Sequence, residues 1–92
     1  MEEPKRGIIE KTAEMFRLPG DLAAGLPRVE IIGSTRVLVE NHRGVVLYTE
    51  ERIDVNGGRI LLSVKGSGLE IRAMNRHELM ICGNVEGVEL LR

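Results

Sequence analysis

The first part of the chain carries apolar residues at the spacing of one helical face. Four large side chains recur at positions i, i+1, i+7 and i+8: Ile8, Ile9, Met15 and Phe16. Pro19 and Gly20 then end the helix, because proline lacks an amide hydrogen and clashes with the preceding turn. Isolated helices shorter than about 12–15 residues are marginal in water. We therefore predict a short amphipathic helical segment within residues 1–28 that docks on the rest of the chain.

Residues 29–92 follow a different pattern, in which short β-branched runs alternate with Gly, Asn and charged residues. The pattern predicts eight short strands: Val29–Ile32, Arg36–Glu40, Val45–Thr49, Arg52–Val55, Arg59–Val64, Leu69–Met74, Glu78–Cys82 and Val85–Leu91. The connections are too short for crossover helices, so neighbouring strands should pair antiparallel as hairpins or coil into successive rungs. We expect a mainly β domain, and a sandwich, a rolled sheet and a solenoid all fit this pattern.

Glycine-containing segments predict where the chain turns. Asn56-Gly57-Gly58 supplies the positive φ angles of a tight hairpin turn. The segment 41–44, Asn-His-Arg-Gly, is typical of a type I turn with Gly44 in the left-handed position. Gly66-Ser67-Gly68 is interpreted as a looser turn.

Alternation within the predicted strands separates a core face from an opposite face. The core face carries Ile53, Val55, Ile60, Leu62, Val64, Leu69, Ile71, Ala73, Leu79 and Ile81. In the last strand Val85 and Val88 have opposite parity, so both can face the core only if the strand slips by one residue. We therefore predict a β-bulge near Gly87.

The opposite face is unexpectedly apolar. It carries Ile32, Leu38, Val46, Tyr48, Leu61, Met74 and Met80, together with Cys82. The N-terminal helix can cover only part of such a face, and soluble monomers seldom expose apolar patches of more than a few hundred Å². The first seven of these residues are our candidate partner-binding residues.

Composition and charge exclude several classes of protein. The 92 residues are 42% hydrophobic and 29% charged, which excludes disorder throughout and leaves room for one small domain. The net charge of -1 gives no basic surplus for nucleic-acid binding. The single cysteine indicates a reducing compartment. The first residues predict neither a signal peptide nor a membrane span, so we expect a cytoplasmic protein.

Candidate chemical groups are few and scattered. His42 and His77 lie far apart in sequence and are expected at surface turn positions rather than in a metal site. Cys82 has no sequence-local base and is interpreted as a small buried apolar residue. The carboxylates are dispersed along the strands as a solvated polar face. We therefore predict no catalysis, no cofactor and no bound metal.

Three segments carry a resemblance to a known family. Leu18-Pro19, the segment LPRVEIIG at residues 26–33 and the segment ENHRGV at residues 40–45 resemble the YabP/YqfC family of sporulation proteins, and in particular its YqfC members. The resemblance extends over nearly the whole chain, and it implies a protein made in the mother cell of endospore-forming bacteria. Its members are usually encoded beside the membrane protein YqfD. The resemblance implies no catalytic residues.

These observations favour a non-enzymatic binding module. We expect it to bind itself or a membrane-associated, YqfD-like sporulation protein, in the mother-cell cytoplasm or at the periphery of the forespore membrane. A self-assembling structural β polymer is the first alternative. A small nucleic-acid-binding barrel is the second, although the strand region holds several arginines with Tyr48 as its only aromatic residue.

Overall fold

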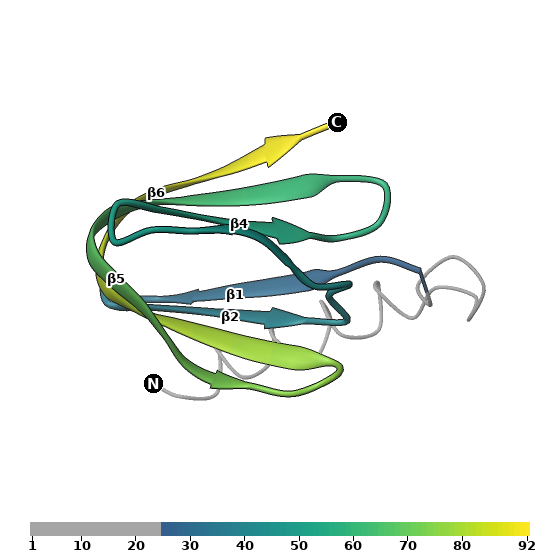
Figure 1. Ribbon diagram of the computed structural model, residues 1–92, viewed down its shortest axis with the longest axis horizontal. Helices are drawn as coiled ribbons and strands as arrows, with labels where there is room; N and C mark the ends of the chain where they lie inside the picture. The colour runs from purple at the N-terminus through teal and green to yellow at the C-terminus, as the bar shows by residue number, and fades with distance from the viewer. Residues whose placement is uncertain (1–24) are drawn as a thin grey trace, which may run out of the picture.

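A computed structural model describes residues 25–92 and shows an antiparallel β protein (Figure 1). Its strands are β1 (Arg28–Ile32), β2 (Arg36–Glu40), β3 (Val45–Tyr48), β4 (Arg52–Asn56), β5 (Leu61–Met74) and β6 (Glu78–Leu91). They form one sheet in the order β1-β2-β6-β5-β4-β3. The expected mainly β, antiparallel architecture is confirmed. The predicted helix falls in residues 1–24, outside the described residues, and Arg28 already belongs to β1.

Two strands are longer than the sequence pattern predicts. β5 and β6 have 14 residues each, and each takes up two of the eight predicted strands. The described residues therefore contain six strands rather than eight. The prediction of a turn at Gly66–Gly68 is wrong, because β5 continues through this segment and bends there. The predicted hairpin at Asn56–Gly58 is confirmed between β4 and β5, with Gly58 at a φ of 93°.

The bends of β5 and β6 touch each other where glycines remove the side chains. A Cβ atom on Gly66 would overlap the carbonyl oxygen of Asn84. Gly83 has a φ of 142°, and a Cβ atom there would lie 2.6 Å from the carbonyl oxygen of Gly68. L-residues with a side chain rarely adopt such a φ. The close approach of the two bent backbones therefore depends on glycine.

The bends turn one sheet into two facing layers, which are seen one above the other in Figure 1. The first layer comprises β1, β2, residues 78–82 of β6 and residues 70–74 of β5. The second layer comprises β3, β4, residues 61–66 of β5 and residues 85–91 of β6. The strands do not stack as rungs, so the solenoid alternative does not describe residues 25–92.

The core lies between the two layers and draws on both. Val37, Val39, Leu79 and Ile81 come from the first layer, Ile53, Val55, Leu62 and Val64 from the second, and Leu69 from the bend of β5. Seven of the ten residues predicted for the core face are buried, and Ile60 and Ile71 are partly buried against the core. The pattern missed Val37 and Val39, whose short strand gives little alternation to follow.

The turn of each short hairpin is hydrogen-bonded to the bend of a long strand. In the β1–β2 turn, the carbonyl oxygens of Thr35 and Ser34 accept hydrogen bonds from the amides of Gly83 and Val85 at 3.1 and 2.8 Å. In the β3–β4 turn, the carbonyl oxygens of Glu51 and Glu50 accept from the amides of Gly66 and Leu69 at 3.1 and 2.8 Å. The two hairpins thus support the two bent strands in corresponding ways.

Bulges decide which side chains face the core near the bends. Lys65 pairs with Gly87 and Gly66 pairs with Val85, which leaves Glu86 as the extra residue. Both Val85 and Val88 pack against the core, so the bulge predicted near Gly87 is confirmed. A second register shift lies between Ile71 and Ala73. It pairs Ala73 with Met80, on the outer face, so the prediction of Ala73 as a core residue is wrong.

Candidate partner-binding surface

An apolar stripe crosses the outer face of the first layer. Cross-strand partners share a face, and Leu38 pairs with Met80, which in turn pairs with Ala73. Their sequence neighbours Val37, Val39, Leu79 and Ile81 point into the core, so these three side chains face outward. Cys82 and Ile32 lie one row further along the same face, on either side of the exposed Arg36. We call Ile32, Leu38, Ala73, Met80 and Cys82 the outer stripe.

The outer stripe is accessible and slightly hollowed. Ile32 is 45% exposed, and Leu38 and Met80 are half-buried. At the end nearest the β5–β6 turn there is a hollow of about 110 Å³, with Leu38, Ala73 and Met80 in its wall beside residues of that turn. An apolar side chain from another molecule can enter such a hollow.

Charged pairs border the stripe. Arg28 and Glu40 form an ion pair of 3.0 Å at the β1–β2 end, and Arg72 and Glu70 form one of 2.9 Å at the β5 edge. In each pair the hydrogen bond to the carboxylate raises the pKa of the arginine. These are solvent-exposed pairs, so they contribute little to stability. The stripe therefore has the apolar centre and polar rim that are typical of a protein–protein interface.

The structure places four of the seven predicted partner-binding residues, Ile32, Leu38, Met74 and Met80, on or beside the outer stripe and separates the other three. Val46 lies in a bulge of edge strand β3 and is 61% exposed. Leu61 is on the outer face of the second layer, where it pairs with Asn56 and Leu91. Met74 pairs with the buried Leu79 and lines the hollow at the end of the outer stripe together with Leu38 and Met80. The sequence pattern grouped these residues by parity, which cannot tell one layer from the other.

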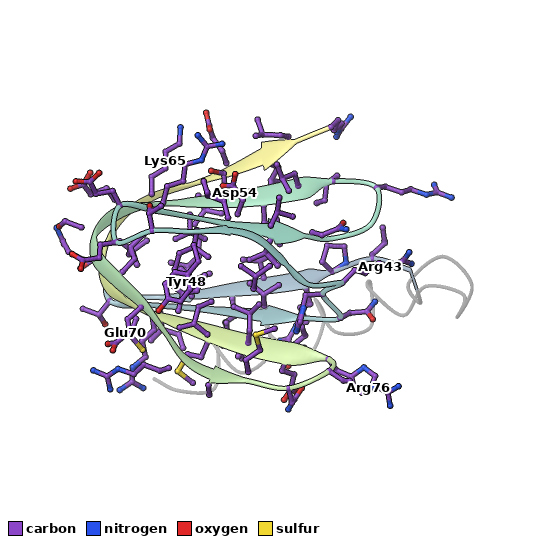
Figure 2. The ribbon with its side chains drawn as sticks, viewed as in Figure 1. Arg43, Tyr48, Asp54, Lys65, Glu70 and Arg76 are labelled. Carbon is purple, nitrogen blue, oxygen red and sulfur yellow. The ribbon has the colours of Figure 1, made fainter. Side chains whose placement is uncertain are left out.

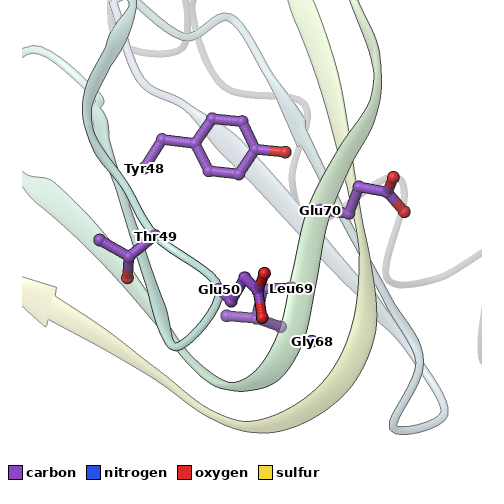
Figure 3. A pocket seen from close by; sticks show the side chains of 6 residues that line it. All are labelled: Tyr48, Thr49, Glu50, Gly68, Leu69 and Glu70. Carbon is purple, nitrogen blue, oxygen red and sulfur yellow. The ribbon is translucent and has the colours of Figure 1, made fainter.

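Tyr48 has a structural role that the sequence did not indicate. It pairs with the buried Ile53, and its hydroxyl oxygen accepts a hydrogen bond of 2.9 Å from the amide of Ile71. It therefore connects β3 in the second layer to the β5 edge of the first layer. Beside it an open hollow of about 480 Å³ is lined by Tyr48, Thr49, Glu50, Gly68, Leu69 and Glu70 (Figure 3).

His42 is buried, against the expectation of a surface turn position. Its Nδ1 atom accepts a hydrogen bond of 3.0 Å from the Gly44 amide, so Nε2 carries the proton and donates to the Asn75 carbonyl oxygen at 3.0 Å. The imidazole thus ties the β2–β3 connection to the β5–β6 turn. His77 is exposed, as expected. Both ring nitrogens of His42 are therefore engaged inside the fold.

Asp54 is likewise buried, although the sequence assigned it to a solvated face. Arg52 donates two hydrogen bonds to its carboxylate, of 3.0 and 2.9 Å. This pairing lowers the pKa of Asp54, and burial opposes the effect. The nearby Ser63 hydroxyl also favours the charged carboxylate, but its geometry falls short of a hydrogen bond. Figure 2 shows Asp54 near Lys65 in the second layer, where Lys65 pairs with Glu89 at 2.8 Å.

Within residues 25–92, no three or more His, Cys, Asp or Glu side chains gather as metal ligands. Over the same range no helix has the length and apolar character needed to cross a membrane. Cys82 is half-buried on the outer stripe, not in the core.

Comparison with known proteins identifies the family of this chain. The model of the YabP family matches residues 25–92, which include all six strands. The chain belongs to the YabP family. It is 30% identical over 75 residues to the "Uncharacterized protein YqfC" of Bacillus subtilis (strain 168), a match that covers 79% of this chain and 78% of that protein. No solved structure matches. The resemblance to the YabP/YqfC family is thus confirmed, and the family match coincides with the folded sheet.

Proposed function

We propose that this member of the YabP family is a non-enzymatic sporulation protein that acts by binding a partner through the outer stripe. The observation that carries the proposal is the row of apolar side chains Leu38, Met80 and Ala73, which lie side by side on β2, β6 and β5 on the outer face of the first layer. The two layers of this sheet already enclose a core between them. Within residues 25–92 the outer stripe therefore has no part in that core, and we propose that another contact covers it.

The partner we propose is a membrane-associated sporulation protein of the YqfD kind, met by this chain in the mother cell at the forespore membrane. Family membership supports the sporulation role. The polar rim supports recognition of a protein rather than insertion into lipid, because Arg28, Glu40, Glu70 and Arg72 place paired charges beside the stripe. A specific contact buries about 800 Å² per partner, so it would extend beyond the stripe onto this rim.

The test compares two charged substitutions on opposite layers. Leu38→Asp places a carboxylate in the centre of the outer stripe, and Val46→Asp places one on the bulged β3 edge, away from it. The assay is co-purification of the full chain with the membrane neighbour from sporulating cells. Circular dichroism checks that both variants keep the β fold.

We expect Leu38→Asp to lose the membrane protein while Val46→Asp retains it at the wild-type level. Burying the unpaired carboxylate of Leu38→Asp in the interface costs free energy, which explains the expected loss of the partner. Retention of the membrane neighbour by a folded Leu38→Asp variant would show that the outer stripe is not the contact.

A further inference from the structure

The C-terminal part of β6 has one free edge among the described residues. β2 pairs with β6 only over residues 78–82, and the β1–β2 turn reaches no further than the amide of Val85. Beyond that point β6 pairs with β5 on one side only. Residues 86–91 thus carry backbone groups along an unpaired edge, and such an edge is a template for another strand.

The free edges elsewhere in the sheet are protected or short. β3 carries a bulge between Val45 and Leu47, which interrupts regular pairing. The β5 edge of the first layer is irregular as well, and the Ile71 amide on that edge already donates a hydrogen bond to the Tyr48 hydroxyl. β1 has only five residues. The β6 edge beyond Glu86 is regular, and its inward-facing Leu90 is 61% exposed although it pairs with the buried Leu62.

We propose that two copies of this chain pair through this edge, antiparallel and two-fold symmetric about Val88. The axis crosses the sheet at Val88, so the two Val88 residues are opposite each other and each Gly87 is opposite Glu89 of the second copy. Antiparallel partners must share a face for the two cores to lie on the same side. Registers centred on residues 87, 88 and 90 meet this condition and avoid facing Glu89 with itself. The one at 88 alone places the two Val88 residues opposite each other.

The charges on the outer face of the second layer complement each other in this register. One row of side chains across the layer reads Arg52, Lys65, Gly87, and the next reads Asp54, Ser63, Glu89. Across the two-fold axis, the row that ends at Gly87 in one copy continues into the row that begins at Glu89 in the other. The positive charges of Arg52 and Lys65 therefore face the negative charges of Glu89 and Asp54. Gly87 has no side chain between Lys65 and Glu89 of the second copy, whose backbones would be about 10 Å apart. Lysine and glutamate side chains together span that distance.

The inner face continues across the axis at Val88, whereas Leu90 lies opposite Glu86 of the second copy in this register. Val88 pairs with Val64, which pairs with Ile53, and all three belong to or pack against the core. Two such apolar rows would meet at the Val88 pair. This contact lies on the second layer, whereas the outer stripe lies on the first, so it is independent of the proposed function.

The test uses Gly87, where there is room for an added Cβ atom in the monomer. A Cβ atom there has no neighbour within 4 Å. Gly87→Glu faces Glu89 of the second copy with a like charge, at two symmetric places in the dimer. Gly87→Lys is the control, because it adds a side chain of similar length whose charge attracts Glu89 of the second copy. Lys65 is the cross-strand partner of Gly87 in the same copy, so thermal unfolding of both variants checks that the monomer is kept. Analytical ultracentrifugation of the full chain gives the dimer Kd for each variant.

We expect a wild-type dimer, a Kd raised about tenfold or more by Gly87→Glu, and a Kd unchanged or lowered by Gly87→Lys. Adding Glu89→Lys to Gly87→Glu should restore the dimer. Amide hydrogen exchange of residues 86–91 should slow as the protein concentration rises. A wild-type chain that stays monomeric up to about 1 mM would overturn the proposal, as would a dimer that Gly87→Glu and Gly87→Lys weaken equally.

Discussion

At the scale of single residues, alternation predicts which face a side chain occupies but not how deeply it is buried. Asp54 lies on the outer face as its parity requires, yet Arg52 and its neighbours bury it. His42 lies in the turn that the sequence indicates, yet both ring nitrogens are used inside the fold. Burial of this kind depends on contacts between distant segments, which a local pattern does not contain.

Asp54 should make stability depend on pH in the acid range. Its pKa in the folded state is lowered from 3.8, chiefly by the hydrogen bonds from Arg52. The pair therefore stabilises the fold above the unfolded value, and this contribution is lost as the pH falls through the lowered pKa. Asp54→Asn should cost about 1 kcal/mol at pH 7, because Arg52 is partly exposed. Denaturant titrations between about pH 5 and pH 2 should show a smaller loss of stability in the variant than in the wild type.

Two adjacent leucines test the assignment of the core face. Leu62 is fully buried between the layers, whereas its neighbour Leu61 is half-buried on the outer face. Leu62→Ala should lower the free energy of unfolding by about 2–5 kcal/mol. Leu61→Ala should lower it by less than about 1 kcal/mol, since less apolar surface is lost. Equal effects in urea titrations would mean that the two faces of β5 are wrongly assigned.

At the scale of elements, glycine has two different uses that look alike in the sequence. Gly57 and Gly58 connect β4 to β5 and end both strands, as predicted. Gly66 and Gly83 instead lie within long strands that bend. A glycine that ends a strand and a glycine within a bend differ only in the close contact of the two bent backbones. That contact joins residues far apart in the chain, so the sequence does not show it.

The bends should be the positions least tolerant of an added methyl group. Gly66→Ala would bring a Cβ atom into the carbonyl of Asn84, so the backbones would have to separate. Gly87→Ala, on the same pair of strands, meets no neighbour within 4 Å. We expect Gly66→Ala to destabilise the fold by about 2 kcal/mol or more and Gly87→Ala by less than about 1 kcal/mol. Thermal unfolding of both variants, followed by circular dichroism, measures the difference.

At the scale of the whole molecule, the family, the β class and most core residues follow from the sequence, whereas the folding-over of the sheet does not. Val37 pairs with Ile81, a long-range contact that no local signal encodes. The same folding-over divides the predicted partner-binding residues between layers. It leaves Ile32, Leu38 and Met80 on the outer stripe and moves Tyr48 to the inner side.

The central claim is that this chain acts in sporulation by contact through the outer stripe, and spore formation tests it most directly. The measurement is the yield of heat-resistant spores in a strain that lacks the chain and carries Leu38→Asp or Val46→Asp at wild-type protein levels. We expect Leu38→Asp to fail to restore spore formation and Val46→Asp to restore it. Full restoration by a folded Leu38→Asp variant would contradict the account.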